Sequence, residues 1–227
     1  YTGSGGSRLL TGNNAYVELV EQELANFHEA QAALFFNSGY EANSGLISTI
    51  VHRHDLIFYD ELVHASLREG IRLSGAKAYS FAHNDVDSLQ QLLEVHRGNV
   101  FVVTESVFSM DGDIAPLADI VSLAEKHQAA IILDEAHATG VLGKKGEGLA
   151  QKLALHTRIF ARVHTFGKAI GTNGAVVLGS QILHDYLINF CKPFIYTTAP
   201  NYLQLASVRM AYKYLTTDHT ALSRLLE

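Results

Sequence analysis

The sequence lacks several features that would point to particular classes of protein. Its 227 residues include a single cysteine, Cys191, so the chain can form no internal disulfide bond, which fits a reducing compartment. It has no long basic run and a net charge of −6, which argues against a nucleic-acid surface. The longest apolar run near the centre, residues 129–133, is far too short to cross a bilayer. The N-terminus also lacks the layout of a signal peptide. We therefore expect a cytoplasmic protein with no nucleic-acid or membrane partner.

The composition is that of a folded domain. Hydrophobic residues make up 48% of the sequence and charged residues 18%, which is enough for one large domain with a substantial core. The sequence has no initiator methionine and stops inside a helical pattern. We therefore expect residues 1–227 to be a single domain of a longer protein.

Short apolar runs alternate with helical patterns along the chain. Residues 1–14 are rich in glycine and predict an irregular loop. The strands are expected at residues 32–36, 56–59, 77–81, 100–104, 130–134, 159–164 and 175–178, and the helices at 17–27, 41–51, 65–73, 86–96, 117–127, 181–190 and 202–215. This alternation predicts a three-layer α/β/α fold with a mostly parallel, seven-stranded sheet and helices on both faces.

Several polar residues follow the ends of these strands. Asp134 closes one strand, Glu105 and Ser106 follow another, and Thr165 and Lys168 follow a third. Ligands of parallel α/β sheets bind beyond the carboxyl ends of the strands. The sequence therefore predicts a functional site at this edge of the sheet.

Lys168 is the residue that best indicates the chemistry. It lies between Gly167 and Gly171, which leave room around its amine for a bulky aldehyde, and Thr165 is placed to reach a phosphate. Asp134 follows the apolar strand upstream. A lysine for the aldehyde and a strand-end aspartate for the pyridine nitrogen are what pyridoxal 5'-phosphate (PLP) requires.

Two neighbouring patterns have alternative explanations. Residues 37–43, NSGYEAN, predict either an ordinary strand-to-helix turn or a phosphate site at a helix N-terminus, and the second is favoured beside Lys168 and Asp134. Residues 134–137 spell DEAH, as in a helicase. A nucleotide site also needs an upstream Gly-Lys followed by Ser or Thr, and the sequence has none. The helicase interpretation therefore fails. A histidine such as His64, taken alone, is more often solvated than functional.

Five segments together resemble a known family. SGYEAN at 38–43, VHASL at 63–67, ESVFSMDGD at 105–113, LDEAHATG at 133–140 and TFGKAIG at 165–171 occur in the order found in the α-oxoamine synthases. These are fold-type I PLP enzymes that join an amino acid to an acyl thioester with loss of CO₂. The resemblance covers essentially the whole chain and implies that residues 1–227 form the large, PLP-binding domain. The family's N-terminal segment and small C-terminal domain would lie outside it.

The resemblance implies catalytic roles for Lys168, Asp134, His137 and His64, and a cofactor-binding role for Ser109. Lys168 would form the Schiff base with PLP and act as the proton-transfer base. Asp134 would keep the pyridine nitrogen protonated, so that the ring can accept electrons. His137, helped by Ser109, would hydrogen-bond the phenolic oxygen of the cofactor. His64 would stack on the face of its ring.

The resemblance also implies how the phosphate is held. The backbone amides of Gly39 and Tyr40, together with Thr165, would bind the phosphate group. Thr197 and Thr198 resemble the family segment that reaches the phosphate of a neighbouring subunit. A homodimer with shared active sites is therefore expected. No metal site is expected, because the histidines lack a coherent set of partner ligands.

The choice of substrates divides the family. Residues 81–85, FAHND, and the segment at 164–180 most resemble the members that join L-alanine to a pimeloyl thioester, carried by CoA or acyl carrier protein, in biotin synthesis. Tyr16 stands where these members often have histidine, near the acyl-CoA entrance. The alternatives are a sister synthase that uses glycine or serine, a fold-type I aminotransferase, or a homologue that binds no PLP.

Overall fold

The computed structural model describes residues 3–218 and 220–226. Within these residues, seven strands form one sheet in the order β1-β7-β6-β5-β4-β2-β3. β7 is antiparallel to both of its neighbours and the other strands are parallel to one another. The strands are β1 (Ala32–Phe36), β2 (Leu56–Asp60), β3 (Lys77–Phe81), β4 (Val100–Glu105), β5 (Ala130–Asp134), β6 (Ala161–Thr165) and β7 (Ala175–Gly179). The predicted mostly parallel, seven-stranded sheet is confirmed.

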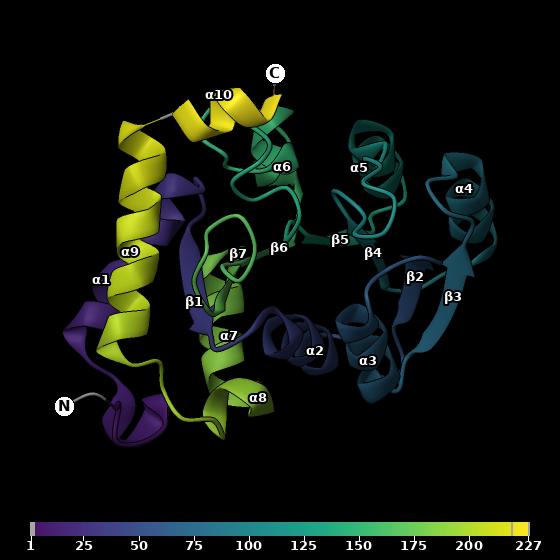
Figure 1. Ribbon diagram of the computed structural model, residues 1–227. Helices are drawn as coiled ribbons and strands as arrows, with labels where there is room; N and C mark the ends of the chain where they lie inside the picture. Colours follow the sequence, from purple (N-terminus) through teal and green to yellow (C-terminus); the bar gives the residue numbers. More distant parts are fainter. Residues whose placement is uncertain (1–2, 219, 227) are drawn as a thin grey trace.

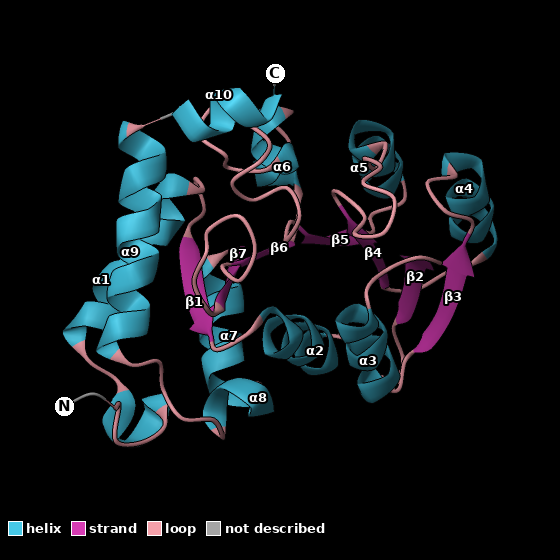
Figure 2. Cartoon of the chain, viewed as in Figure 1, coloured by secondary structure: helices cyan, strands magenta, loops and turns pink. Residues whose placement is uncertain are grey.

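Helices cover both faces of the sheet, which completes the three predicted layers (Figures 1 and 2). In the view of Figure 1, α2 and α3 lie below the strands, α4 and α5 lie above them, and α1 and α9 cover the end at β1. The helices are α1 (Ala15–Phe27), α2 (Gly39–Ile50), α3 (Ala65–Ser74), α4 (Val86–Val95), α5 (Leu117–Lys126), α6 (Leu149–Lys152), α7 (Gln181–Phe190), α8 (Lys192–Ile195), α9 (Tyr202–Thr217) and α10 (Thr220–Leu226).

Strands at the β1 edge and in the centre of the sheet are buried on both faces, as expected for a sheet covered by two helical layers. All five residues of β1 are buried, and so are four of the five in β5. Helix starts are fixed by side-chain caps: Asn14 accepts the amides of Tyr16 and Val17, and Ser38 accepts that of Glu41. Local capping and apolar patterning therefore place these elements close to their predicted bounds.

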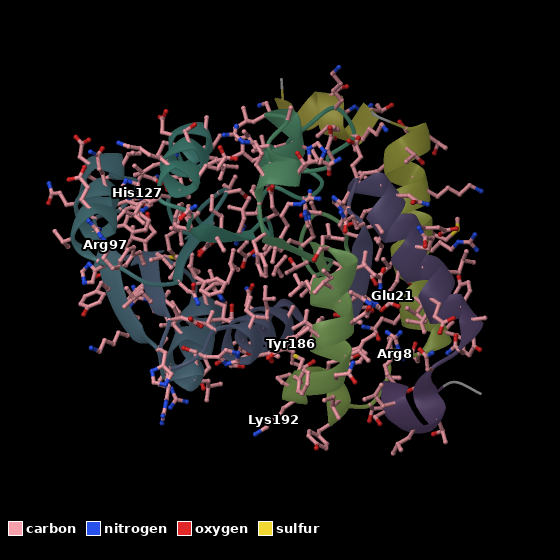
Figure 3. The ribbon with its side chains drawn as sticks, turned by 180° about the vertical axis from the view of Figure 1, so that it is seen from behind. Arg8, Glu21, Arg97, His127, Tyr186 and Lys192 are labelled. Carbon is pink, nitrogen blue, oxygen red and sulfur yellow. The ribbon has the colours of Figure 1, made fainter. Side chains whose placement is uncertain are left out.

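The N-terminal segment differs from the prediction. Residues 8–12, expected as part of an irregular loop, form a π-helical turn, Arg8–Gly12. Arg8 makes a buried ion pair with Glu21 of α1, at 2.7 Å between Nη1 and Oε1, and these two side chains lie together in Figure 3. Glu21 also accepts the backbone N–H of Phe35 in β1. The ion pair fixes the turn against the first helix and strand, a contact that the local sequence does not reveal.

Two further differences concern element ends and short helices. β6 begins at Ala161 rather than at residue 159, because His156–Arg158 form a 3₁₀ turn just before it. The short helices α6 and α8 were not predicted, since four residues are too few for a helical period to be visible. No helix in the described part of the chain is long and apolar enough to cross a membrane.

Candidate active site

Three parallel strands bring their carboxyl ends together at one edge of the sheet. β4, β5 and β6 end at Glu105, Asp134 and Thr165, and Glu105 is the register partner of Asp134. β1, which is parallel to them, ends just before Asn37 at the start of the 37–43 segment. The predicted gathering of polar residues at this edge is confirmed.

A pocket of about 270 Å³ opens at this edge. Its lining includes most of the residues that the sequence singled out, namely Gly39, Tyr40, His64, Asp134, Thr165 and Lys168. Gly167, predicted to leave room around the amine, and Glu105, predicted at this edge, line it as well. The lining also includes residues to which the sequence assigned no individual role, namely Asn37, Ser38, Asn43, Ser66, Ala136, Asn173 and Gly174. The pocket is thus formed by segments from five separate parts of the chain.

Asp134 is buried at the end of β5, with 4% of its surface exposed. Its Oδ1 accepts the backbone N–H of Ala136 at 2.8 Å, and its Oδ2 accepts Nδ2 of Asn43 at 2.6 Å. Nδ2 of Asn43 also donates to Ser66 Oγ at 3.0 Å. These bonds fix the orientation of the carboxylate, and the role of Asn43 in α2 was not predicted.

Lys168 lies in the loop between β6 and β7. The loop is closed by hydrogen bonds from Phe166 N to Gly174 O and from Thr172 N to Phe166 O. Gly171 adopts a φ of +72°, so it serves the turn of the backbone, whereas Gly167 lines the pocket. The two glycines that were predicted to leave room around Lys168 therefore have different roles in the structure.

The amine of Lys168 lies against His137, with 2.5 Å between Nζ and Nε2. Desolvation lowers the pKa of Lys168 below its usual range, while the nearby carboxylates of Asp134 and Glu105 raise it by less. The pKa of His137 is also lowered, first by burial and then by the positive charge of Lys168. A lysine with a lowered pKa has a larger neutral fraction, which is the form that acts as a nucleophile or a base.

His64 caps helix α3 at the pocket. Its Nδ1 accepts the backbone N–H of Ser66 at 3.2 Å and lies 2.8 Å from Ser66 Oγ, while its own backbone N–H donates to Glu105 Oε1 at 2.5 Å. Hydrogen bonds thus fix both the backbone of His64 and its imidazole ring. An imidazole fixed in this way at the pocket wall is suited to contact a flat ligand.

Glu105 belongs to the site, although it was predicted only to follow the end of a strand. Its side chain is buried and lines the pocket beside Asp134. Desolvation, and then the negative charge of Asp134, raise the pKa of Glu105 to about 8. A carboxyl with so high a pKa inside a pocket is typical of a functional site. Its position after a buried strand was the only available signal, because burial depends on the tertiary structure.

The opposite wall of the pocket is suited to an anion. The first amides of helix α2, at Gly39 and Tyr40, have no partners within the helix and carry the positive end of its dipole. The hydroxyl oxygen of Thr165 is buried and has no hydrogen-bond partner among the described residues. A Cβ on Gly39 would approach Thr165 Cγ2 to 2.4 Å, so this close approach requires glycine. The wall thus offers unpaired donors around a compact space.

Besides His137, which contacts Lys168, three predicted residues do not line this pocket. Ser109 is exposed at the tip of a turn that follows β4, and the structure places it among no other site residue. Thr197 and Thr198 lie beside the pocket, where Nδ2 of Asn37 donates to Thr197 Oγ1 and to the carbonyl of Thr198. The expected contacts of these three residues with the cofactor or a second subunit stay predictions. Among the described residues no cluster could hold a metal ion, and none was predicted.

Comparison with known proteins agrees with this geometry. The family model described as aminotransferase class I and II matches residues 2–224. The 8-amino-7-oxononanoate synthase of Emericella nidulans is 48% identical over 96% of this chain and 56% of the relative. The chain spans about half the length of the curated relatives that it matches.

Solved structures give the same result. A serine palmitoyltransferase from S. paucimobilis, solved with a bound PLP–myriocin aldimine, superposes with a TM-score of 0.95 and 34% identity over 99% of this chain and 57% of that chain. An 8-amino-7-oxononanoate synthase from Francisella tularensis superposes with a TM-score of 0.83 and 35% identity over 96% and 62%. The chain belongs to the aminotransferase class I and II family, and within that family its similarities are to the α-oxoamine synthases, as its five motifs predicted.

Proposed function

We propose that this chain is the cofactor-binding part of a PLP-dependent enzyme that condenses L-alanine with a pimeloyl thioester, releasing CO₂ and CoA or acyl carrier protein. The product would be 8-amino-7-oxononanoate, an intermediate of biotin synthesis. The observation that carries the proposal is the pairing of Lys168 and Asp134 across one pocket, with an anion-binding wall beside them. The named relative with 48% identity supports the choice of reaction.

The residues of the pocket fit PLP. The unpartnered hydroxyl of Thr165 and the amides of Gly39 and Tyr40 are suited to its phosphate. The carboxylate of Asp134 is suited to the protonated pyridine nitrogen, and the amine of Lys168 to the aldehyde. Each functional group of the cofactor thus has a matching group on the protein.

Each protein group would have a separate role in the reaction. Bound PLP supplies a ring that takes up the negative charge left when the Cα proton is removed. Lys168, with its lowered pKa, would remove that proton and later return one. Asp134 would hold the proton on the ring nitrogen, His64 would cover the face of the ring, and His137 would hydrogen-bond its phenolic oxygen. Fixed charges of this kind lower the barrier without reorganisation.

A sister reaction with serine is the second candidate. The serine palmitoyltransferase structures superpose with a TM-score of 0.95, which is higher than the 0.83 of the oxononanoate synthase. The cofactor residues would be the same in both cases, and only the substrate pocket would differ. An aminotransferase would share Lys168 and Asp134 but would have no reason to carry His64 and His137. A homologue without PLP is disfavoured because the lysine, the aspartate and the phosphate wall are all present.

Two further parts of the proposal concern the whole protein. We propose a homodimer in which Thr197 and Thr198 reach the phosphate of the neighbouring subunit, and their position beside Asn37 at the pocket supports this. We also propose a cytoplasmic location, which the single cysteine supports.

Cofactor binding is tested by spectroscopy. The purified protein with added PLP should show the near-visible absorption band of a lysine-bound cofactor. Lys168→Ala should abolish this band, and Lys152→Ala, a change of an exposed lysine in α6, should leave it intact. An unchanged band in Lys168→Ala would remove the lysine assignment.

Substrate choice is tested by an activity matrix. Alanine, glycine and serine are each combined with pimeloyl, acetyl and palmitoyl thioesters, and thiol release is followed. The proposal expects the highest kcat/KM for alanine with the pimeloyl thioester. A preference for serine with palmitoyl-CoA would favour the sister reaction, and no thiol release with any pair would contradict both.

A further inference from the structure

A histidine outside the pocket bridges two carboxylates. His83, just after β3, places Nδ1 2.9 Å from Oδ1 of Asp60 and Nε2 2.6 Å from Oδ2 of Asp113. Asp60 is fully buried at the end of β2, and His83 is largely buried. The ring also meets Phe108 edge to face, with 4.5 Å between centroids. His83 is thus in contact with two separate segments of the chain.

This geometry determines the protonation state of the ring. A neutral imidazole has one N–H and one lone pair, so it can donate to only one of the two carboxylates. The other nitrogen would then face carboxylate oxygen with no proton between them, which is repulsive. Only the imidazolium, with both nitrogens protonated, satisfies both contacts. The same two carboxylates raise the pKa of His83 above 6.5, although partial desolvation opposes them.

On one side, the bridge holds the turn that leads to His64. Asp60 Oδ1 accepts the backbone N–H of Leu62 at 2.9 Å. The backbone carbonyl of Asp60 accepts the backbone N–H of Val63 at 3.1 Å. The next residue is His64, at the pocket wall. The carboxylate that binds His83 therefore also holds the turn that leads to His64.

On the other side, the bridge holds a hairpin that carries Ser109. Residues 106–108 pair with 113–115 through bonds from Phe108 N to Asp113 O and from Ala115 N to Ser106 O. Ser109 and Gly112 lie in its tip, and Asp113 lies in the pair of residues next to the tip. His83 contacts both arms, at Phe108 and Asp113. Nδ2 of Asn84 adds a second donor to Asp113 Oδ2 at 2.5 Å.

We propose that His83, as an imidazolium, is a positioning residue that fixes the His64 turn and the Ser109 hairpin relative to each other. Its importance for catalysis rests on the proposed function, because His64 and Ser109 are expected to contact the cofactor. The bridge itself depends on neither substrate nor cofactor. The two hydrogen bonds of the imidazolium connect the end of β2, the segment after β3 and the hairpin after β4.

The bridge makes this part of the site sensitive to pH. The charged groups that face His83 are Asp60 on β2, Asp113 on the hairpin and Glu61 on the turn, whose Oε1 accepts the backbone N–H of His83 at 3.1 Å. All three are acids, and the two that contact the ring, Asp60 and Asp113, favour its charged form. Because the pKa of His83 is raised in the fold, the stabilisation is complete below pH 6.5 and is lost as pH rises through the folded pKa.

The test uses the cofactor-free protein, so it is independent of the proposed reaction. Hydrogen-exchange protection factors, corrected for intrinsic rates, are measured for residues 106–115 at several pH values. The protection of the hairpin should fall as pH rises through the pKa of His83, which nitrogen-15 NMR should place above 6.5. In His83→Gln, which offers one donor, protection should be about tenfold lower at acid pH and should no longer vary with pH.

Two further variants sharpen the test. Asp113→Asn should lower the pKa of His83 and loosen the hairpin, while the turn at residues 61–64 stays protected through Asp60. His54→Gln, a change of an exposed histidine whose contact is with Arg53, should leave both segments unchanged. If His83 titrates at or below 6.5, or if hairpin protection is the same in wild type and Asp113→Asn, the proposal is wrong.

Discussion

The molecule holds two groups of ionisable residues that include members with shifted pKa values and that differ in how they are partnered. At the pocket, Lys168, Glu105 and Asp134 lie together, and Thr165 and Asn43 each keep a buried oxygen without a partner. The second group lies at the side of the sheet covered by α1 and α9. There His28 and His164 lie with ring centroids 4.0 Å apart. The first group opens to a cavity, while the second is closed.

Hydrogen-bond partners account for most polar atoms in the closed group. His28 Nδ1 lies 3.2 Å from Gln151 Oε1, so this nitrogen carries the proton, and Nε2 accepts from Tyr212 Oη at 2.9 Å. His164 Nδ1 donates to Thr139 Oγ1 at 2.8 Å, because that hydroxyl donates to the carbonyl of Glu135. Both rings are therefore neutral, and burial lowers both pKa values, that of His28 to about 3.

The difference shows how a shifted pKa should be interpreted. Buried polar groups whose partners are supplied by the fold serve stability, even when their pKa values are strongly displaced. Groups that keep unpaired atoms toward a cavity are available to a ligand. Thr165, Asn43 and Glu105 line the pocket, so we assign them to the site. His28 and His164 line no part of it, and we assign them to the core, although His164 Nε2 is also buried without a partner among the described residues. Four predictions test that division, beginning with the largest expected effect.

Asp134→Asn should slow the proposed condensation by about a hundred- to a thousandfold, because a neutral amide no longer holds the proton on the ring nitrogen. Stability should change little, since Asn43 can rotate its amide to accept from the new side chain. Steady-state kinetics and PLP titration check this. Asp119→Asn, a change of an exposed residue in α5, is the matched control. Wild-type rates in Asp134→Asn would remove its electrostatic role.

His28→Leu should lower the free energy of unfolding by about 2 kcal/mol, because it leaves the buried Tyr212 hydroxyl without a partner and removes one hydrogen bond of Gln151. PLP affinity should stay unchanged below the melting temperature. Urea unfolding and PLP titration measure the two effects, with His54→Leu as an exposed control. A large loss of PLP affinity at unchanged stability would mean that the two regions are not separate.

Acid should destabilise the fold through the closed group. The folded pKa of His28 is lowered from 6.5 to about 3, so the unfolded chain binds a proton in this window and the folded chain does not. Stability should be complete above pH 6.5 and should fall as pH is lowered toward 3, by up to about 1.4 kcal/mol per pH unit for each histidine. Urea midpoints at several pH values check this, and His28→Leu should reduce the slope. An equal slope in that variant would exclude His28 as a cause.

Glu105→Gln should have the smallest effect, changing activity at pH 7 by less than about tenfold, because glutamine resembles the protonated carboxyl and can still accept from His64 N. The pKa of Glu105 is raised from 4.5 to about 8, so wild type loses stability as pH rises between these values. The stability of the variant relative to wild type should therefore increase over this window. A difference that does not vary with pH would show that the carboxyl has no shifted pKa.

Much of the fold follows from local patterns. The strands at 32–36, 77–81 and 130–134 were predicted with their observed bounds, because each is a short run of strand-forming residues between turn signals. The order of strands and helices also predicted which ends meet at one edge, and so placed Asp134 and Thr165 together. Lys168 was identified by residue type and by its neighbours in sequence.

The tertiary structure alone decided the rest. Glu105 lines the pocket with a raised pKa because β4 and β5 pair in register, and Asn43 binds Asp134 across 91 positions of sequence. His83 bridges Asp60 and Asp113, which lie 23 and 30 positions away. Local sequence determines which residues form a strand or begin a helix. Contacts over such separations depend on how whole elements pack, and that packing decides which polar atoms are paired, buried or left free for a ligand.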